Sequence, residues 1–369
     1  MKTRKTVAIT FIFIALFLFG NQCIAQKKLN IVSPCTLSTN SWSKEKANAW
    51  YTAQPWISGC NFQPSTAINS IEMWQSESFD LATINKELGW AEELGFKVVR
   101  VFLNSVVWKD NPTVFKRNIN QYLTVATNHG IRTIFVFFDD CFNKESNIGK
   151  QPDPIPGIIL SGWIQDPSCS LRNDTTKLFP ILKLYVKDIL KTYINDTRIY
   201  MWDLYNEPGN SSHGISSLPL LKNVYKWARE VNPSQPISAG IWYFDCVELN
   251  NFQLENSDII TYHTYTNEVE HQKLINKLKL LGRPMICTEY MARPLNSHFD
   301  NIMPLLKSNN IGAINWGFVY GKTNAIFAWS EPIASGKEPL VWFHDIYRND
   351  KTAFDVKEIE LIKNLNGVK

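Results

Sequence analysis

The chain alternates short apolar runs with longer amphipathic segments over most of its length. The short runs are rich in β-branched and aromatic residues, which is typical of buried strands, and the longer segments repeat apolar residues at helical spacing. The pattern predicts strands at residues 56–62, 96–103, 131–139, 198–206, 236–242, 258–265, 283–290 and 311–319. It predicts helices at residues 79–95, 115–130, 176–193, 218–232, 268–282, 297–310 and 353–365, and a weaker one near 245–256.

Eight alternating strand and helix units predict an α/β fold, a closed (β/α)8 TIM barrel. An open, doubly wound sheet is the alternative. That fold usually begins with a glycine-rich turn, and "GCNFQPS" (59–65) lacks the required spacing. No linker, repeat or low-complexity tract interrupts the pattern, so residues 26–369 are expected to form one catalytic barrel domain.

The first 25 residues have the features of a secretory signal peptide. A basic start at Lys2, Arg4 and Lys5 precedes an apolar stretch, and small residues before Gln26 suit a cleavage site. We therefore expect a secreted or periplasmic protein. Lipid attachment at Cys23 is less favoured, because Gln22 stands where a small residue is expected. No second long apolar run predicts a membrane span.

Charge and cysteine content limit the kinds of partner and metal site that the protein is expected to have. Cleavage after residue 25 removes three cations and no anion, so the net charge falls from +4 to +1. Because its basic residues are scattered, the chain is not expected to bind nucleic acid. It is also expected to be a monomer. Six cysteines remain and no clustered Cys/His spacing indicates zinc. We expect a disulfide between Cys141 and Cys169, and a buried free thiol at Cys287.

Polar residues stand where several of the apolar strands end. Glu207 closes the fourth predicted strand and Glu289 the seventh. In a barrel the carboxyl ends of the strands surround one site, so these side chains should meet. The same reasoning adds further residues from strands two, four, six and eight, namely Arg100, Asn206, His263, Tyr265 and Trp316.

Two facing carboxylates are what glycoside hydrolysis needs. One protonates the leaving oxygen, and the other attacks the anomeric carbon or activates water. Arg100 near Glu289 would favour its anion, whereas Glu207 needs less cationic surroundings to keep its proton. Pro208 should bias Glu207 towards an extended backbone.

The triplet Asn206-Glu207-Pro208 at strand four, with Glu289 at strand seven, resembles glycoside hydrolase clan A, and most of all the family 5 cellulases, mannanases and related β-glycanases. The resemblance covers essentially the whole mature chain. It implies a retaining double displacement with Glu207 as acid/base and Glu289 as nucleophile, acting on a β-glycan without a cofactor or metal. It also implies supporting roles for Arg100, Asn206, His263, Tyr265 and Trp316. One departure is that the third strand ends in "FFDDCF" (137–142), where the family commonly has a histidine.

Thirteen tryptophans are many for a chain of this length, and flat indole faces suit pyranose rings. Of those in predicted loops or at strand ends, we expect Trp74, Trp316 and Trp329 to bind substrate. Such aromatic loops favour an open cleft and attack on internal bonds. The long segment 140–170 could instead wall off one end and favour attack at chain ends.

Three other functions are compatible with the same barrel. A non-catalytic sugar-binding protein would not need both glutamates. A metal-dependent hydrolase could use Asp139, Asp140 and the histidines, but two adjacent aspartates more often lie in a solvated loop, and clustered histidine spacing is missing. Transglycosylation uses the same chemistry as hydrolysis and cannot be separated from it by sequence.

Overall fold

The computed structural model describes residues 37–242 and 245–368 of the 369-residue chain. The predicted signal peptide (1–25), with Cys23, lies outside the described residues, as does Cys35. Among the described helices, none combines the length and the apolar character needed to cross a membrane.

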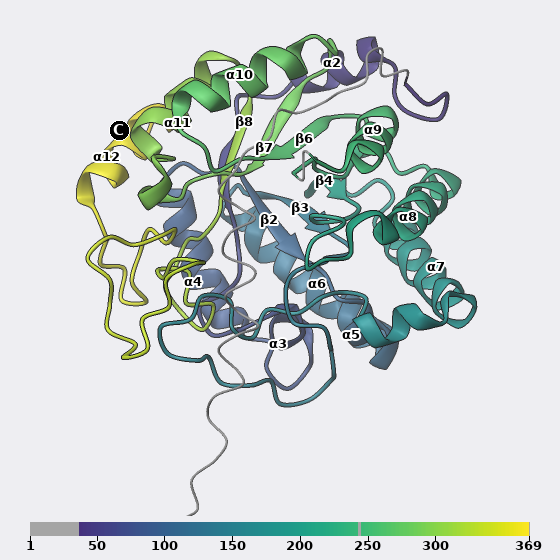
Figure 1. Ribbon diagram of the computed structural model, residues 1–369, viewed down its shortest axis with the longest axis horizontal. Coiled ribbons are helices and arrows are strands. Elements are labelled where there is room, and N and C mark those ends of the chain that lie inside the picture. The colour runs from purple at the N-terminus through teal and green to yellow at the C-terminus, as the bar shows by residue number, and fades with distance from the viewer. Residues whose placement is uncertain (1–36, 243–244, 369) are drawn as a thin grey trace, which may run out of the picture.

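The described residues contain eight parallel strands in one sheet with the order β5-β4-β3-β2-β1-β8-β7-β6. A bridge between Ile241, just after β5, and Tyr262 of β6 joins the two ends of this sheet, so the barrel closes. The fold is the predicted single-domain (β/α)8 barrel (Figure 1). The strands are β1 (Ser58–Asn61), β2 (Val98–Phe102), β3 (Arg132–Val136), β4 (Ile199–Asp203), β5 (Ile237–Ser238), β6 (Ile260–His263), β7 (Met285–Glu289) and β8 (Gly312–Asn315).

Each predicted helix is present, including the weak one. The helices that surround the barrel are α4 (Leu81–Glu93), α6 (Pro112–Asn128), α7 (Thr175–Thr192), α8 (Leu218–Val231), α9 (Val247–Asn256), α10 (Glu268–Lys279), α11 (Phe299–Ser308) and α12 (Val356–Asn366). The sequence pattern missed three others, which are α2 (Lys44–Thr52), α3 (Ser70–Trp74) and α5 (Ser105–Asp110). The last two are only one to two turns long, too short for an apolar periodicity to show.

Alternation along β2 shows how the barrel aims a side chain at its own axis. Val99 and Val101 pack in the large core between the strands and the helices, whereas Val98 packs in the small core inside the barrel. Because successive strand residues point to opposite faces, Arg100 faces inwards on the same side as Val98. A fully buried arginine therefore stands above the apolar floor of the barrel.

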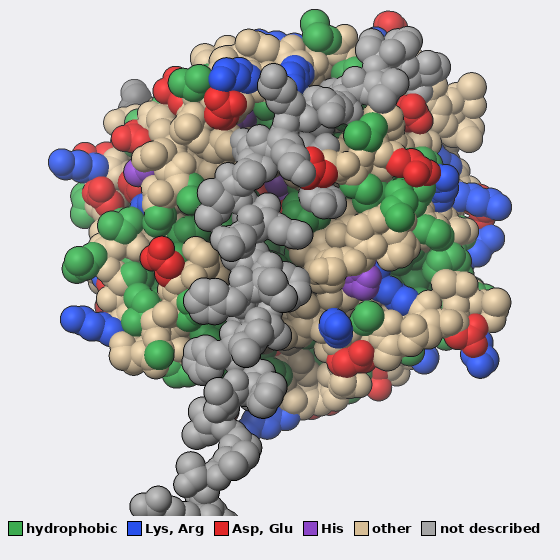
Figure 2. All heavy atoms as spheres, in the orientation of Figure 1, with side chains coloured by type: hydrophobic (Ala, Val, Ile, Leu, Met, Phe, Trp, Pro, Cys, Tyr) green, Lys and Arg blue, Asp and Glu red, His purple; other side chains and the backbone are tan. Residues whose placement is uncertain are grey.

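Two long loops shape the carboxyl end of the barrel. The loop between β3 and α7 and the loop between β8 and α12 lie next to each other in the lower part of Figure 1. Backbone hydrogen bonds join them, for example from the N–H of Leu160 to the carbonyl of Thr323 at 2.7 Å. On the face shown in Figure 2, acidic and basic side chains are interspersed, in keeping with the near-neutral charge of the chain.

Candidate active site

Glu207 and Glu289 face each other at the carboxyl end of the barrel. Glu289 is the last residue of β7, and Glu207 lies in the loop that follows β4. One carboxylate oxygen of each, together with a ring nitrogen of His263 from β6, lie within 4.8 Å of one another. Barrel closure thus brings together three residues that the sequence pattern placed on three different strands.

Glu289 accepts hydrogen bonds from a cation and from a phenol. Nη1 of Arg100 donates to its Oε1 at 2.9 Å, and the hydroxyl of Tyr265 donates to its Oε2 at 2.7 Å. Hydrogen bonds to a carboxylate favour its ionised form, and a buried arginine beside it does so more strongly. Arg100 thus lies beside Glu289 as expected, and Tyr265 contacts the same carboxylate.

Arg100 is the centre of a buried polar network. Its Nε and Nη2 donate to Oδ2 of Asp203 at 3.0 and 2.8 Å, and Nη2 also donates to Oδ1 of Asn206 at 2.7 Å. Its Nη1 donates to Oδ1 of Asn61 at 2.8 Å as well as to Glu289. The guanidinium fork is therefore used in full, which fixes the arginine in one orientation. Sequence reasoning missed Asn61 and Asp203, although a charged residue within the apolar run of β4 was a usable signal.

Glu207 has three neutral neighbours. Its Oε2 accepts hydrogen bonds from Nδ2 of Asn210 at 2.6 Å and from the thiol of Cys141 at 3.4 Å. Its Oε1 lies 2.9 Å from Nδ1 of His263. Burial lowers the pKa of His263 to about 4, so this imidazole is neutral at ordinary pH. Sequence reasoning missed both Asn210 and Cys141.

The backbone at Glu207 differs from the predicted extended form. Its φ is +44°, in the left-handed region, even though a proline follows. Steric restriction by Pro208 was the basis of the prediction, and here tertiary contacts override it. The N–H of Gly209 donates to Oδ2 of Asp140 at 2.7 Å, which fixes the turn directly after Glu207. The turn aims the carboxyl group of Glu207 at Glu289 rather than at solvent.

The two carboxyl groups differ in burial and in their partners, since the side chain of Glu207 is 13% exposed and that of Glu289 is 6% exposed. Burial raises the pKa of Glu207 and of Glu289 alike, and the charge of Glu207 raises that of Glu289 further. Two carboxylates this close do not both ionise easily, so one retains a proton. Of the two carboxyl groups, only that of Glu289 accepts a hydrogen bond from the guanidinium of Arg100.

Asp139 and Asp140 are buried in the protein rather than solvated, so the expectation of a solvated loop was wrong. Oδ1 of Asp139 accepts from Nδ2 of Asn206 at 2.9 Å, and its Oδ2 accepts from the indole of Trp163 at 2.7 Å. Burial raises the pKa of Asp139 to about 7. Both ends of the Asn206 amide are thus held in a fixed orientation, the nitrogen by Asp139 and the oxygen by Arg100.

The cysteine prediction is corrected in one part and confirmed in another. Cys141 and Cys169 are free thiols rather than a disulfide pair. Cys141 faces Glu207, whereas Cys169 begins a short 3-10 helix at the surface side of the same loop. Cys287 is a buried free thiol, as predicted.

The three tryptophans expected to bind substrate lie in different environments. Trp74 is fully buried at the end of α3, where its indole donates to the carbonyl of Phe102 at 2.7 Å and packs among core rings, so it cannot touch a sugar and that prediction was wrong. Trp316 follows β8 and is 9% exposed. Trp329 is partly exposed and packs against Tyr265, with ring centroids 4.8 Å apart. Trp329 therefore packs on a residue that contacts Glu289, and the N–H of Trp316 donates to the carbonyl of Tyr290, the residue after Glu289, at 3.0 Å. Trp74 supports the fold.

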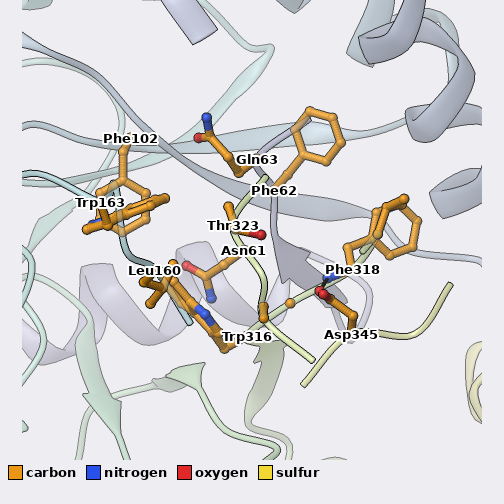
Figure 3. A pocket seen from close by; sticks show the side chains of 13 residues that line it. Asn61, Phe62, Gln63, Phe102, Leu160, Trp163, Trp316, Phe318, Thr323 and Asp345 are labelled. Atoms are coloured by element: carbon orange, nitrogen blue, oxygen red, sulfur yellow. Dashed lines mark hydrogen bonds between the residues drawn. The ribbon is translucent and has the colours of Figure 1, made fainter. Parts of the chain in front are cut away.

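A small hollow adjoins Trp316, between the ends of β1, β2 and β8. Figure 3 shows Asn61, Phe102, Leu160, Trp163 and Trp316 around one end of it. Trp163 and Leu160 come from the long loop after β3, and both are almost fully buried. This loop therefore contributes side chains to the site from outside the strands themselves.

Glu207, His263 and Glu289 also carry donor atoms of the kind that bind metals. However, Nδ1 of His263 is directly hydrogen-bonded to Glu207, and the guanidinium of Arg100 already neutralises Glu289 at 2.9 Å. A second cation there would meet the arginine charge. The donor set therefore fits proton transfer better than metal binding, and Asp139 and Asp140, each held by protein donors, add no free ligand.

Comparison with known proteins identifies the family. The sequence pattern of the family named cellulase, glycosyl hydrolase family 5, matches residues 58–321, which is well over half of the chain. The chain belongs to glycosyl hydrolase family 5. Membership makes it a glycoside hydrolase acting on β-glycans, as the two strand-end glutamates predict. Among curated proteins, no match to the chain is found.

Solved structures with the same barrel share little sequence with this family 5 enzyme. The endo-1,4-β-D-mannanase of Thermotoga petrophila RKU-1 is 16% identical, with a TM-score of 0.54 over 85% of this chain and 99% of that one. An exo-β-1,4-mannosidase from Opitutaceae bacterium strain TAV5 is 16% identical, with a TM-score of 0.57 over 90% and 62%. A Streptomyces cattleya GH5_18 protein in complex with GlcNAc is 11% identical, with a TM-score of 0.55 over 85% and 80%. At these identities the likeness establishes the fold.

Proposed function

We propose that the protein is a retaining β-glycosidase in which Glu289 is the nucleophile and Glu207 the acid/base. The observation that supports this most directly is the contrast between their partners, a buried arginine at Glu289 and neutral donors at Glu207. Oxygens of the two carboxyl groups lie within 4.8 Å. This agrees with the separation of about 5–5.5 Å in retaining enzymes rather than the roughly 6.5–9.5 Å that inverting enzymes need to admit a water.

The residues suggest a two-step reaction. An oxygen of Glu289 attacks the anomeric carbon, the bond from that carbon to the glycosidic oxygen breaks, and the oxygen takes the proton of Glu207. Glu207, now ionised, then removes a proton from water as the water oxygen attacks the same carbon and releases Glu289. Arg100 and Tyr265 hold Glu289 in place throughout. His263 holds Glu207 towards the bond being broken.

Paired alanine variants test these assignments. On a 4-nitrophenyl β-glycoside, Glu207→Ala and Glu289→Ala should each lose about 10²-fold or more of kcat. With added azide, Glu207→Ala should form a β-glycosyl azide, because the intermediate on Glu289 still forms. Glu289→Ala should form the α-azide instead. The exposed Glu77→Ala serves as the control and should behave as the unaltered enzyme. Full activity in a protein that carries both Glu207→Ala and Glu289→Ala would overturn the mechanism.

We also propose that the substrate is a β-linked saccharide met outside the cytoplasm. The structural neighbours named as mannanases and mannosidases make β-mannan the first to test, followed by xylan, β-glucan and galactan. Export after cleavage before Gln26 predicts that the mature protein begins at Gln26, which mass spectrometry of the purified protein would show. A mature protein that keeps residues 1–25 would contradict this expectation.

Whether the enzyme cuts internal bonds depends on the shape of the site. Internal attack, which the aromatic loops led us to expect, needs room for sugars on both sides of the two glutamates.

Transglycosylation would use the same intermediate on Glu289, with a sugar hydroxyl in place of water. Analysis of the products at high substrate concentration distinguishes transglycosylation from hydrolysis, because only transglycosylation makes saccharides longer than the substrate.

A further inference from the structure

Asp140 is a buried carboxyl group to which the proposed reaction assigns no step. It lies in the loop after β3 and is fully buried. Its Oδ2 accepts hydrogen bonds from the N–H of Gly209 at 2.7 Å and from the hydroxyl of Ser217 at 2.6 Å. Its Oδ1 accepts from the hydroxyl of Tyr205 at 2.7 Å and from Nη2 of Arg172 at 2.5 Å. A carboxylate has about four acceptor positions, so protein donors occupy those of Asp140.

The donors Tyr205, Gly209 and Ser217 surround Glu207 along the chain. Tyr205 precedes Glu207 in the loop after β4, Gly209 follows it, and Ser217 is the residue before α8. The hydroxyl of Ser217 also accepts from the N–H of Gly209 at 3.1 Å, which links the two residues to each other. Asp140 therefore ties the start and the end of this loop to a single carboxylate.

The peptide unit between Pro208 and Gly209 is held on both sides. Its N–H donates to Asp140 at 2.7 Å, and its carbonyl accepts from the indole of Trp242 at 3.0 Å. This peptide follows the left-handed backbone of Glu207, whose φ is +44°. A residue other than glycine keeps such a backbone only where surrounding contacts enforce it. Asp140 supplies the charged member of those contacts.

Arg172 compensates the burial of Asp140. Its Nη2 contacts Asp140, its Nε donates to the carbonyl of Pro167 at 3.2 Å, and its side chain is 16% exposed. A buried carboxylate without a cation beside it would be costly, so the ion pair is what allows Asp140 to stand inside the protein. Arg172 belongs to the 3-10 helix Cys169–Asn173. The long loop after β3 thus provides both the carboxylate and its counter-ion.

We propose that Asp140 is a positioning residue for the acid/base, and that with Arg172 it holds the turn that keeps Glu207 within reach of the leaving oxygen. This inference rests on the proposed function, since it takes Glu207 as the acid. Asp140 carries no proton in the reaction, because protein donors occupy its oxygens. Its loss should impair protonation of the leaving oxygen and spare the attack by Glu289, which Arg100 holds independently.

Substrates that differ only in the leaving group separate these two effects. We would measure kcat/KM on the 2,4-dinitrophenyl and the phenyl β-glycosides of mannose, glucose and xylose, and use the sugar that the unaltered enzyme cleaves fastest. This constant reports the steps up to departure of the aryl group. Dinitrophenolate leaves without a proton, whereas the phenyl glycoside needs the acid.

Asp140→Asn should act as a weaker form of Glu207→Ala. An amide cannot accept all of the hydrogen bonds of the carboxylate, so kcat/KM should fall about 10- to 100-fold on the phenyl glycoside and less than about twofold on the dinitrophenyl glycoside. Glu207→Ala should show the same pattern with a larger loss. In the Glu207→Ala protein, Asp140→Asn should cause no further loss, because the group that it positions is gone.

Asp258→Asn is the matched control. Asp258 is also fully buried, pairs with Nη2 of Arg229 at 2.7 Å and accepts from the N–H of Ile237 at 2.9 Å, but it lies at the amino end of the barrel, opposite the site. Asp258→Asn should cost stability and leave the ratio of the two kcat/KM values unchanged. Equal losses on both substrates in Asp140→Asn, or no loss on either, would overturn the inference.

Ser217→Ala is a second variant that disturbs no charge, in case Asp140→Asn does not fold. It removes one donor to Asp140, so it should lose about fivefold on the phenyl glycoside alone. An unchanged ratio in Ser217→Ala would also count against Asp140. If Glu207→Ala loses activity equally on both substrates, the proposed function fails and the inference falls with it. If Glu207→Ala shows the leaving-group pattern and the Asp140 and Ser217 variants do not, the inference alone fails.

Discussion

Arg100 and Glu289 form a buried ion pair in which Nη1 lies 2.9 Å from Oε1. Glu207 sits close to the same carboxylate but takes its hydrogen bonds from the neutral groups of Asn210, Cys141 and His263. The two carboxyl groups therefore differ in their partners, and the mechanism proposed above places the charge on Glu289 and the proton on Glu207. The pH dependence of catalysis should report this asymmetry, since activity requires one ionised and one protonated carboxyl group.

Replacing Arg100 should shift the acidic limb of the pH profile. Arg100→Lys keeps a positive charge but cannot hold Asp203, Asn61, Asn206 and Glu289 together. The pKa of Glu289 should rise, so the acidic limb of kcat/KM should move to higher pH and the bell should narrow. Arg132→Lys, outside the site on the far end of β3, is the control. An acidic limb that stays in place would show that Arg100 does not set the ionisation of Glu289.

Cys141 should tune the acid rather than take part in the reaction. Its thiol donates to Glu207 and thereby lowers the pKa of that carboxyl group. Cys141→Ala should raise the pKa of Glu207 and move the basic limb of kcat/KM to higher pH, whereas Cys141→Ser retains a donor and should move it less. Cys169→Ala, at the other free thiol of the same loop, should leave the limb unchanged. A basic limb at the same pH in all three variants would contradict this assignment.

Truncation of Trp74 should lower stability, whereas truncation of Trp329 should mainly weaken substrate binding. Trp74→Ala opens a cavity in the core and should lower the free energy of unfolding by about 3–5 kcal/mol, as measured in urea. Trp329→Ala should change the unfolding midpoint less and should raise KM, because that indole lies beside Tyr265 at the site. Should Trp74→Ala prove too unstable to purify, Trp74→Phe offers a milder cavity with the same expected direction. A normal KM in Trp329→Ala would remove that residue from the substrate site.

Glu87 should make the protein less stable at alkaline pH. It is fully buried in α4, and burial raises its pKa from 4.5 to about 7. A raised folded pKa means that the contribution of the group is present below about pH 4.5 and is lost as the pH rises through about 7. The loss amounts to on the order of 3 kcal/mol by pH 8. Glu87→Gln should flatten the decline in unfolding free energy between pH 5 and pH 8, whereas the exposed Glu77→Gln should not.

Most of the fold and the two glutamates could be predicted because both depend on simple periodicities. Apolar runs alternate with helical stripes, eight such units close a barrel, and closure alone brings Glu207 to Glu289. What could not be predicted depends on side-chain direction and on long-range contacts. Trp74 could face solvent or core equally well by its spacing, and only the packing of α3 decides the matter.

The supporting network was only partly visible in the sequence for the same reason. Asp203 and Asn61 lie on strands whose apolar pattern conceals which polar residue faces the axis, and they become recognisable once Arg100 is seen to need partners. Cys141 looked like half of a disulfide because the spacing to Cys169 allowed one. Its contact with Glu207 arises from the turn at the end of β3, which no local pattern encodes.

The left-handed backbone at Glu207 means that folding and catalysis favour different residues at one position. Glycine would relieve the φ of +44° and would also remove a buried carboxyl group, so Glu207→Gly should melt at a higher temperature than the active enzyme. Such a protein would not cleave its substrate but would be more stable to heat than the active enzyme. It would therefore suit crystallographic capture of an uncleaved saccharide, and the enzyme could be made into a stable lectin-like reagent by that single replacement.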